Sequence, residues 1–445
     1  MEKVGMVSLG CPKNLVDSEI MLGLLEKAGY IVINDEQEAD VLIVNTCSFI
    51  DDAKEESIKA ILETAQNKKR GKCRALLVAG CLAQRYGPEL LADLPEVDGI
   101  IGTGSVPEIV AAVRQALTGE RTVAVAKPGF EYAGGLPRVS STPPFSAYLK
   151  IADGCNNCCS YCVIPDVRGS YRSRPFEDVI EEAADLVNRG VREIILVAQD
   201  TTAYGIDRYG RYRLAGLLRQ LAAIDGLRWL RFLYTYPTRL GQDLIEVIAG
   251  EPKICRYLDV PLQHASDGVL SRMNRQMRQK DIRQLIERLR SALPGLVLRT
   301  SFIVGFPGET KSEFQELLDF MAEVKFERAG VFTYSREEGT AAALMSGQVD
   351  EQKKDERQER AMLLQQEISY ARNRAMIGKI ITVLVEGAAA EKKGVFWGRS
   401  EADAPAIDGV VYVKTGKELA PGDFVQVLVK EAYPYDLGGV LVTGD

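Results

Sequence analysis

The feature that most constrains the fold of this chain is a regular alternation of short apolar runs with helical segments. In the first part of the chain, apolar runs at residues 4–9, 41–45 and 75–79 are each followed by helical periodicity, which is clearest over residues 15–27 and 55–66. Continuous apolar runs separated by helices are typical of buried parallel strands. The pattern up to about residue 117 therefore predicts an open parallel α/β sheet.

A second region with the same alternation follows a stretch rich in proline, glycine and serine at residues 127–146, whose composition is typical of a linker. Six further strands are expected at residues 148–152, 193–198, 229–234, 257–260, 297–304 and 330–334, with helices between them. Six strands fall short of the eight in a complete parallel barrel. We therefore expect an open, partial (β/α)6 barrel in the centre of the chain.

The alternation of strands and helices ends near residue 350. Residues 350–376 form one long, highly charged helical pattern, which we interpret as a solvated connecting helix. Five short strands are then expected at residues 379–386, 395–399, 409–413, 424–429 and 440–443, as in a small antiparallel β-barrel of the OB type. The expected fold is thus α/β multidomain, divided at 1–126, 127–146 (linker), 147–349, 350–376 (connecting helix) and 377–445.

Composition narrows the chemistry that this chain can perform. The 55 basic and 62 acidic residues leave a net charge of -7, so no chain-wide basic field is available to hold nucleic acid. The chain has nine cysteines but only one histidine, His264, which excludes zinc sites built from several histidines. Without a signal peptide or an apolar run of membrane-spanning length, we expect a cytoplasmic protein. In a reducing compartment, clustered cysteines favour metal ligation over disulfides.

The strongest motif is CxxxCxxC, formed by Cys155, Cys159 and Cys162 just after the first strand of the central region. Three thiolates in one tight loop have the spacing of an iron-sulfur cluster. A 4Fe-4S cluster normally takes four cysteine ligands, so three leave one iron open to a substrate or cofactor. Cys158 lies inside the motif and is interpreted as a bystander.

A second set of cysteines is dispersed in the sequence but shares one topological position. Cys11, Cys47 and Cys81 each follow a predicted parallel strand, and the carboxyl ends of such strands lie along one edge of the sheet. Glycines precede two of them and would let the backbone approach a bulky inorganic group. We therefore expect a second 4Fe-4S cluster with an open iron, although three buried core cysteines would give the same pattern. Cys73 and Cys255 are interpreted as core residues.

These motifs resemble those of the radical S-adenosylmethionine (SAM) methylthiotransferase family, and the resemblance covers almost the whole chain. The signature includes Tyr161 before the last cysteine of the loop, the N-terminal cysteine triad and a C-terminal TRAM-like barrel. Strings at residues 10–14 (GCPKN), 166–169 (DVRG), 197–205 (VAQDTTAYG) and 257–264 (YLDVPLQH) resemble the branch that acts on ribosomal protein S-twelve of the small subunit.

The resemblance implies a transferase that adds a methylthio group to the β-carbon of an aspartate. It implies two 4Fe-4S clusters, with Cys11, Cys47 and Cys81 holding the auxiliary cluster, and SAM as both radical source and methyl donor. An unactivated C–H bond calls for such a cofactor-borne radical and needs no histidine. Positions matching the family's SAM-binding stretches are Tyr161, Gln199, Asp200 and Gly305. Gln199 and Asp200, at the end of a strand, are equally compatible with helix caps, and Gly305 is equally compatible with a Gly-Pro turn. His264 is given no role.

The charge of the C-terminal barrel separates a protein substrate from an RNA substrate. Residues 376–445 carry ten acidic and seven basic side chains, a net charge of -3. An RNA-binding barrel would present a basic groove, whereas an acidic one suits a basic protein such as a ribosomal protein. Two alternatives remain: a methylthiotransferase acting on adenosine in transfer RNA, and a non-catalytic iron-sulfur protein. Partners would include an electron donor and a sulfur source. Arg168, Arg172 and Arg174 are candidate carboxylate partners or simply a solvated basic loop.

Overall fold

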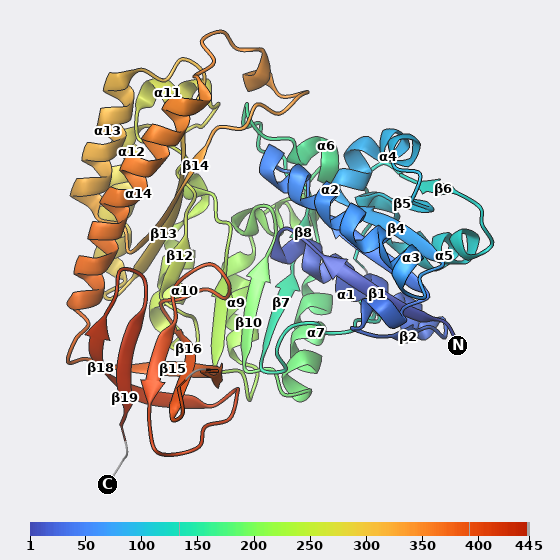
Figure 1. Cartoon of the computed structure of the whole chain (residues 1–445). Helices are drawn as coiled ribbons and strands as arrows, with labels where there is room; N and C mark the ends of the chain where they lie inside the picture. The colour runs from blue at the N-terminus through green and yellow to red at the C-terminus, as the bar shows by residue number, and fades with distance from the viewer. Residues whose placement is uncertain (133, 391, 443–445) are drawn as a thin grey trace.

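The computed structural model describes residues 1–132, 134–390 and 392–442. Its N-terminal domain contains a six-stranded parallel sheet with the strand order β2-β1-β3-β4-β5-β6 (Figure 1). The three predicted runs become β1 (Lys3–Ser8), β3 (Val41–Thr46) and β4 (Ala75–Gly80). The sheet is completed by β2 (Ile31–Val32), β5 (Gly99–Ile101) and β6 (Thr122–Ala124). Sequence reasoning missed these strands because two or three residues are too few to show a periodic pattern.

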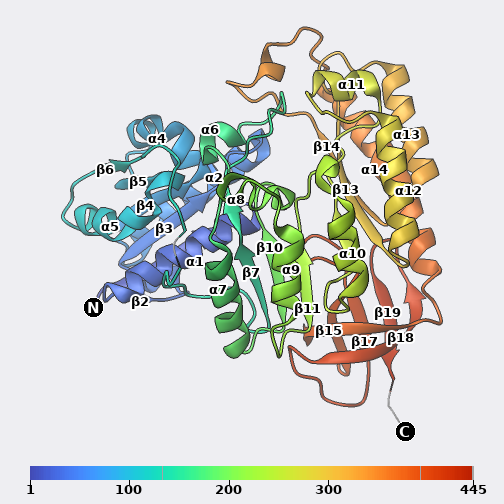
Figure 2. The ribbon, with the colours of Figure 1, turned by 180° about the vertical axis from the view of Figure 1, so that it is seen from behind.

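Helices cover both faces of this sheet (Figures 1 and 2). They are α1 (Pro12–Lys27), α2 (Asp51–Ala65), α3 (Asn67–Arg70), α4 (Cys81–Asp93) and α5 (Ile109–Leu117), with 3-10 turns at Glu36–Glu38 and Thr103–Glu108. Every residue of β3 and β4 is buried, as expected for central strands covered on both faces. The predicted open parallel α/β sheet is confirmed.

The central domain contains the six predicted strands, all parallel: β7 (Ser146–Lys150), β10 (Glu193–Val197), β11 (Trp229–Phe232), β12 (Tyr257–Asp259), β13 (Val297–Val304) and β14 (Arg328–Thr333). They form two three-stranded sheets, β11-β10-β7 and β12-β13-β14. Between the two sheets, Leu230 of β11 forms a parallel bridge with Ile254, which precedes β12, and Thr235 N–H donates to the Asp259 carbonyl at 3.0 Å. The six strands thus form the predicted open, partial barrel, with a weak seam in its middle.

An outer layer of helices surrounds these strands: α6 (Ile164–Arg168), α7 (Phe176–Asn188), α8 (Ile206–Tyr209), α9 (Leu214–Ala222), α10 (Gln242–Gly250), α11 (Asp267–Arg272), α12 (Gln279–Ala292) and α13 (Lys311–Val324). Short 3-10 turns occur at Thr201–Ala203, Pro237–Arg239 and Ala341–Leu344, and β8 (Ala152–Asp153) pairs with β9 (Arg172–Ser173). Helix α13 begins after Thr310, which forms a capping box with Glu313.

The connecting helix α14 (Glu351–Arg374) is not the solvated connector that its charge suggested. It packs along β14 and α13, and Lys354, Ala361, Gln365 and Ile368 on one side of it are buried. Polar members of this stripe have partners in the barrel: Gln365 donates a hydrogen bond to the Phe326 carbonyl at 3.1 Å. The prediction failed because polar residues occupy a buried stripe that hydropathy alone does not reveal.

The C-terminal domain is a closed five-stranded barrel with the order β15-β16-β17-β19-β18. Its strands are β15 (Ile380–Ala388), β16 (Val395–Ser400), β17 (Val411–Lys414), β18 (Phe424–Ala432) and β19 (Leu437–Leu441). One correction is needed, since β17 and β19 run parallel in a barrel predicted to be antiparallel. The last strand was expected to reach Thr443, which lies outside the described residues.

This barrel docks on the amino ends of the central strands, below them in Figure 1. Glu193, the first residue of β10, is fully buried and pairs with Arg399 of β16 at 2.6 Å. The Tyr257 hydroxyl at the start of β12 donates to Asp408 at 2.6 Å. The carboxyl ends of the central strands are thereby left facing the N-terminal domain. The chain places its chemistry at that junction.

Candidate active site

The dispersed cysteines lie at the carboxyl edge of the N-terminal sheet. Cys11 is the N-cap of α1 after β1, Cys47 follows β3, and Cys81 begins α4 immediately after β4. Because β1, β3 and β4 are direct neighbours, the three cysteines sit side by side at the ends of adjacent strands. The predicted convergence at one edge is therefore present in the fold.

The glycines before these cysteines serve the packing of the chain itself. Gly10 has a φ of +83°, and a Cβ there would lie 2.8 Å from the Cβ of Cys47. Gly80 has a φ of +93°, and a Cβ there would lie 2.2 Å from the Asn45 side-chain oxygen. Both are required by left-handed backbone and close contact. The sequence argument had assigned this space to an inorganic group.

The pKa values of the three cysteines Cys11, Cys47 and Cys81 shift in different directions. Burial raises the pKa of Cys47 to about 12, and the neighbouring Cys81 and Cys11 thiols add to the effect. Burial would also raise the pKa of Cys11, but the cations Lys13 and Arg168 outweigh it and lower that pKa below the ordinary thiol value. Burial also raises the pKa of Cys81, so a metal that binds Cys47 and Cys81 must displace their protons, which couples metal uptake to proton release.

The loop of the CxxxCxxC motif lies at the carboxyl edge of the central barrel, after β8. Its ends are fixed by the backbone: Cys155 N–H donates to the Gly169 carbonyl and Ser160 N–H donates to the Met273 carbonyl, both at 3.1 Å. Burial raises the pKa of Cys162 to about 12, with further contributions from Cys159 and Cys155. The three motif cysteines therefore lie close enough to influence one another.

Arg275 contacts this loop from outside, whereas Cys158 lies within it. Arg275 donates from Nη1 to Cys159 Sγ at 3.7 Å and is held in place by a 2.6 Å hydrogen bond to the Pro261 carbonyl. Cys158 is exposed; its thiol donates to the Asn156 carbonyl at 3.8 Å, and its backbone carbonyl accepts a hydrogen bond from Asn274 Nδ2 at 2.6 Å. Exposure on the outside of the loop fits its interpretation as a bystander. Cys73 and Cys255 are buried, as expected for core residues.

The two polar residues after β10 face the loop, and one of them is a cap. Asp200 accepts a hydrogen bond from Ala203 N–H at 3.2 Å and from Asn157 Nδ2 at 3.0 Å, and it pairs with Arg239. Gln199 donates to Asp153 at 2.7 Å. Within the described chain, the Gln199 Oε1 atom is buried without a hydrogen-bond partner, so it is available to a bound molecule.

The other two residues of the predicted SAM-binding set have mainly packing contacts. The Tyr161 ring meets Phe306 edge-on, with a centroid distance of 6.4 Å. Gly305 has a φ of +72°, and a Cβ there would lie 2.3 Å from the side chain of Lys354 on α14. The close approach of the connecting helix thus accounts for this glycine.

A buried ionic network joins the two cysteine sites. Arg168 of α6, which is 2% exposed, pairs with Asp17 of α1 at 2.5 Å and with Asp153 at 3.5 Å. It also donates to Cys81 Sγ at 3.4 Å. Lys150 of β7 completes the network through Asp17 at 2.6 Å and Asp153 at 3.3 Å. The loop after Cys162 is thereby bound directly to the N-terminal domain.

This network corrects the idea of a solvated basic loop. Arg168 and Arg174 are buried, and Arg174 pairs with Glu182 at 2.6 Å. Their carboxylate partners belong to the chain itself. Sequence reasoning also missed Lys150, whose signal was a charged residue inside an otherwise apolar strand, and Lys13, which stands in the quoted GCPKN string.

His264 lies at the same carboxyl edge and is fully buried. Its Nδ1 accepts a hydrogen bond from Ser266 N–H at 3.0 Å, which is a structural contact. Its Nε2 has no hydrogen-bond partner among the residues described, and it lies 3.9 Å from Glu309 Oε1. One ring nitrogen of His264 is therefore hydrogen-bonded, and the other is not, among the residues described.

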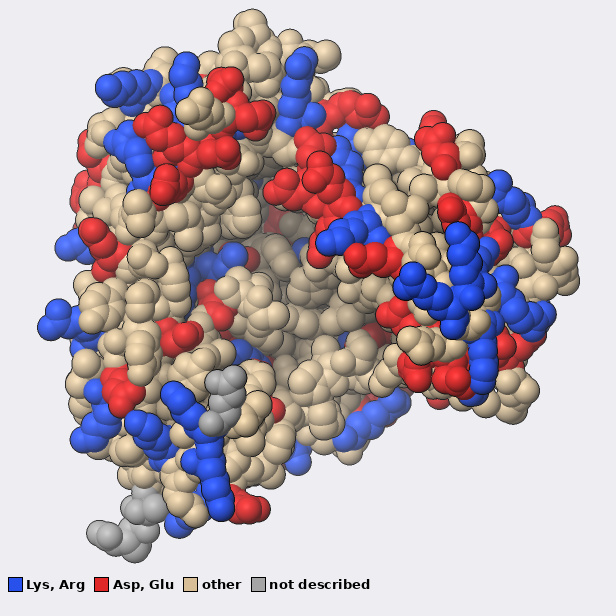
Figure 3. All heavy atoms as spheres, in the orientation of Figure 1, with Lys and Arg blue, Asp and Glu red and all other residues tan. Residues whose placement is uncertain are grey.

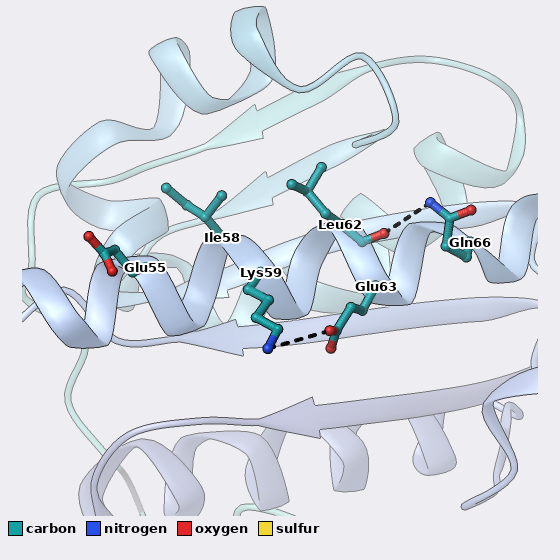
Figure 4. Close-up of a pocket in the computed structure, with 6 residues that line it drawn as sticks. All are labelled: Glu55, Ile58, Lys59, Leu62, Glu63 and Gln66. Atoms are coloured by element: carbon teal, nitrogen blue, oxygen red, sulfur yellow. Dashed lines mark hydrogen bonds and ion pairs between the residues drawn. The ribbon is translucent and has the colours of Figure 1, made fainter.

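The space-filling view shows a hollow between the N-terminal domain and the rest of the molecule (Figure 3). A different, shallow pocket lies on the outer face of α2, where Ile58 and Leu62 stand among charged residues (Figure 4). It contains no cysteine. Within the described ranges, no helix combines the length and apolar character that a membrane crossing requires.

No three His, Cys, Asp or Glu side chains in the described part of the chain are arranged to hold a single metal ion. The donor set at both sites is thiolate sulfur, which suits iron-sulfur clusters.

Comparison with known proteins assigns all three domains. Residues 3–102 match the uncharacterized protein family UPF0004, residues 149–321 match the radical SAM superfamily, and residues 377–442 match the TRAM domain. Among solved structures, the radical SAM methyltransferase TsrM from Kitasatospora setae aligns with a TM-score of 0.58 at 15% identity, covering 77% of this chain and 74% of that one. The fold and the cysteine loop define a radical SAM protein.

Curated relatives identify the branch. A protein of Pelotomaculum thermopropionicum is 61% identical over 99% of both chains, and one of Desulforamulus reducens is 55% identical over 99% of this chain and 100% of its own. Both are named ribosomal protein uS12 methylthiotransferase RimO. This chain belongs to the RimO family of methylthiotransferases.

Proposed function

We propose that this chain transfers a methylthio group to the β-carbon of an aspartate in ribosomal protein uS12. The observation that carries the proposal is the identity of 50–61% over nearly the full length with proteins of that name. The two three-cysteine sites on facing sheet edges support it, because the reaction needs two separate functions. The acidic C-terminal barrel suits a basic protein substrate.

The proposal assigns Cys155, Cys159 and Cys162 to the cluster that binds SAM, and the triad at residues 11, 47 and 81 to the auxiliary cluster. When bound, these 4Fe-4S clusters supply the electron that cleaves SAM to a hydrogen-abstracting radical and the site that carries the transferred sulfur. The chain's own residues hold the thiols in place. Arg275 and Arg168 direct N–H groups at Cys159 Sγ and Cys81 Sγ.

The same proposal extends to the surroundings of the site. Gln199, with its unsatisfied Oε1 beside the motif loop, is the best placed of the four predicted SAM-contacting residues to accept a hydrogen bond from a ligand. A low-potential electron donor and a source of sulfide act as partners. The enzyme works in the cytoplasm, where ribosomal proteins and reduced thiols are found together. Domain limits at residues 126, 146, 349 and 376 belong to this proposal.

The test is an anaerobic incubation of the iron- and sulfide-reconstituted enzyme with purified uS12, SAM and a chemical reductant. Intact-protein mass spectrometry should show uS12 gaining one methylthio group in place of a hydrogen, localised to one aspartate by fragmentation. Cys155→Ala should abolish the gain, and the exposed Cys158→Ala should leave it unchanged. SAM cleavage without any mass gain on uS12 would refute the proposal. A methylthiolated adenosine in added transfer RNA would replace it by the alternative substrate.

A further inference from the structure

Lys13 is a buried cation that points from one cysteine site toward the other. It stands in the first turn of α1, two residues after Cys11, and only 7% of it is exposed. Its Nζ lies 3.2 Å from the ring centroid of Tyr234, which follows β11 at the carboxyl edge of the central barrel. The ammonium group of the N-terminal domain is thus seated at the edge of the radical SAM domain.

Three other cations near this junction have carboxylate partners. Lys150 and Arg168 share Asp17 and Asp153, and Arg299 pairs with Asp259 at 2.7 Å. Lys13 is different: in the ranges that the structure describes, neither an ion pair nor a hydrogen bond engages its Nζ. Of these four cations, Lys13 is the one without a carboxylate partner in the described ranges; the acidic group on which its charge acts is the Cys11 thiol.

An unpaired buried ammonium is costly, and a cation–π contact offsets only part of that cost. The nearby carboxylates are not free to pair with it. Asp259 is held by Arg299 and by a 2.9 Å hydrogen bond from Tyr234 N–H, and Asp153 is held by Lys150, Arg168 and Gln199. An ammonium group carries three N–H donors, and none of those of Lys13 has a hydrogen-bond partner among the described residues.

We propose that Lys13 binds the side-chain carboxylate of the substrate aspartate. This inference rests on the proposed function. The β-carbon of an aspartate is bonded directly to its carboxylate carbon, so a cation that holds the carboxylate also positions the carbon whose hydrogen is replaced. Lys13 follows Cys11 by two residues, and its ammonium group lies over Tyr234 at the carboxyl edge of the central barrel, the edge that also carries the CxxxCxxC loop. Its charge also gives a physical reason for selecting aspartate, since asparagine is neutral and glutamate places its β-carbon one methylene further from its carboxylate.

The experiment is a double-mutant cycle between enzyme and substrate. Binding of purified uS12 to the reconstituted full-length enzyme is measured by calorimetry for wild type and Lys13→Met, each with unmodified uS12 and with uS12 whose target aspartate is replaced by asparagine. A charge-assisted contact predicts a loss of about tenfold to a hundredfold in affinity for either single change. The combined change should cost no more than one single change.

Three controls keep the outcome interpretable. Lys27→Met removes a lysine from the exposed end of the same helix and should bind uS12 like wild type. Iron content and the cluster absorbance of Lys13→Met should equal those of wild type, because the contact is to substrate and not to a cluster. Lys13→Arg, which keeps the charge, should recover part of the affinity for unmodified uS12.

Several results would overturn the inference. Independent, multiplicative losses for the enzyme and substrate changes would show that Lys13 does not contact the aspartate. A loss of iron or a changed cluster spectrum in both Lys13→Met and Lys13→Arg would assign Lys13 to the auxiliary cysteine site instead. If wild type neither binds nor modifies uS12, the proposed function fails; if it does both and the cycle shows no coupling, only the role of Lys13 fails.

Discussion

The buried network around Arg168 predicts a large and specific loss of stability when its arginine is removed. Replacing Arg168 by methionine keeps much of the side-chain volume but leaves Asp17 and Asp153 with one cation, Lys150, in a region where all four side chains are buried. One carboxylate is then uncompensated. Breaking a buried ion pair in this way costs about 3–5 kcal/mol.

Urea unfolding of the metal-free chain measures this cost, together with the loss of the contact between Arg168 and Cys81, without any contribution from cluster binding. The midpoint shift multiplied by the denaturant slope gives the change in the free energy of unfolding. Arg172→Met, in the same loop, is the matched control, since that arginine donates only to the backbone carbonyls of Ser170 and Arg168. It should cost no more than about 1 kcal/mol.

A second substitution tests the cause. Adding Asp17→Asn to Arg168→Met removes the surplus negative charge and leaves Lys150 paired with Asp153, so the double variant should regain about 1–3 kcal/mol relative to Arg168→Met. If Arg168→Met alone lies within about 1 kcal/mol of wild type, or if the two changes simply add, the network does not hold the domains together as argued.

Three further predictions concern other parts of the molecule. Glu193→Gln should weaken barrel docking at neutral pH. Burial opposes ionisation of Glu193, but Arg399 holds its pKa below the usual value, so the stabilisation is present above the unfolded-state pKa and is lost as the pH falls through the folded-state pKa. Thermal unfolding of wild type and variant should therefore converge in acid. Gly10→Ala should reduce iron at the auxiliary site and leave the other site loaded, because the added methyl meets Cys47; equal iron in both proteins would contradict this. Replacing Cys11, Cys47 and Cys81 together by alanine should lower the iron content of the reconstituted chain by about half, and an unchanged iron count would remove the triad from consideration as a cluster site.

Sequence reasoning was most successful where a single strong signal determined the structure. The fully apolar runs became β3, β4 and β10 with nearly the expected ends, and the cysteines at strand ends were placed on one edge by topology alone. The family assignment is confirmed, whereas the ligand roles of the six cysteines stay a prediction. The shorter strands β2, β5 and β6 were missed because they exist through pairing with long neighbours, not through their own pattern.

Errors arose where a residue's partner lies far away in the sequence. The residues next to Arg168 in the sequence do not indicate that it is buried, because its partner Asp17 precedes it by 151 positions. The stripe on α14 was hidden for the same reason: Gln365 is polar, yet it is buried against a carbonyl of the barrel. Charge type is local information, but charge pairing is a property of the assembled fold.

The docking of the β-barrel on the amino ends of the central strands sets a minimum length for any substrate that uses both. A five-residue strand such as β10 spans about 17 Å, and the barrel lies at one end of it while the cysteine loop lies at the other. A substrate that touches the barrel and presents its reactive carbon between the cysteine sites must therefore extend past the edge of the central domain. A folded protein has the reach to contact the barrel and the cysteine loop together, whereas a short peptide that carries the target aspartate alone does not.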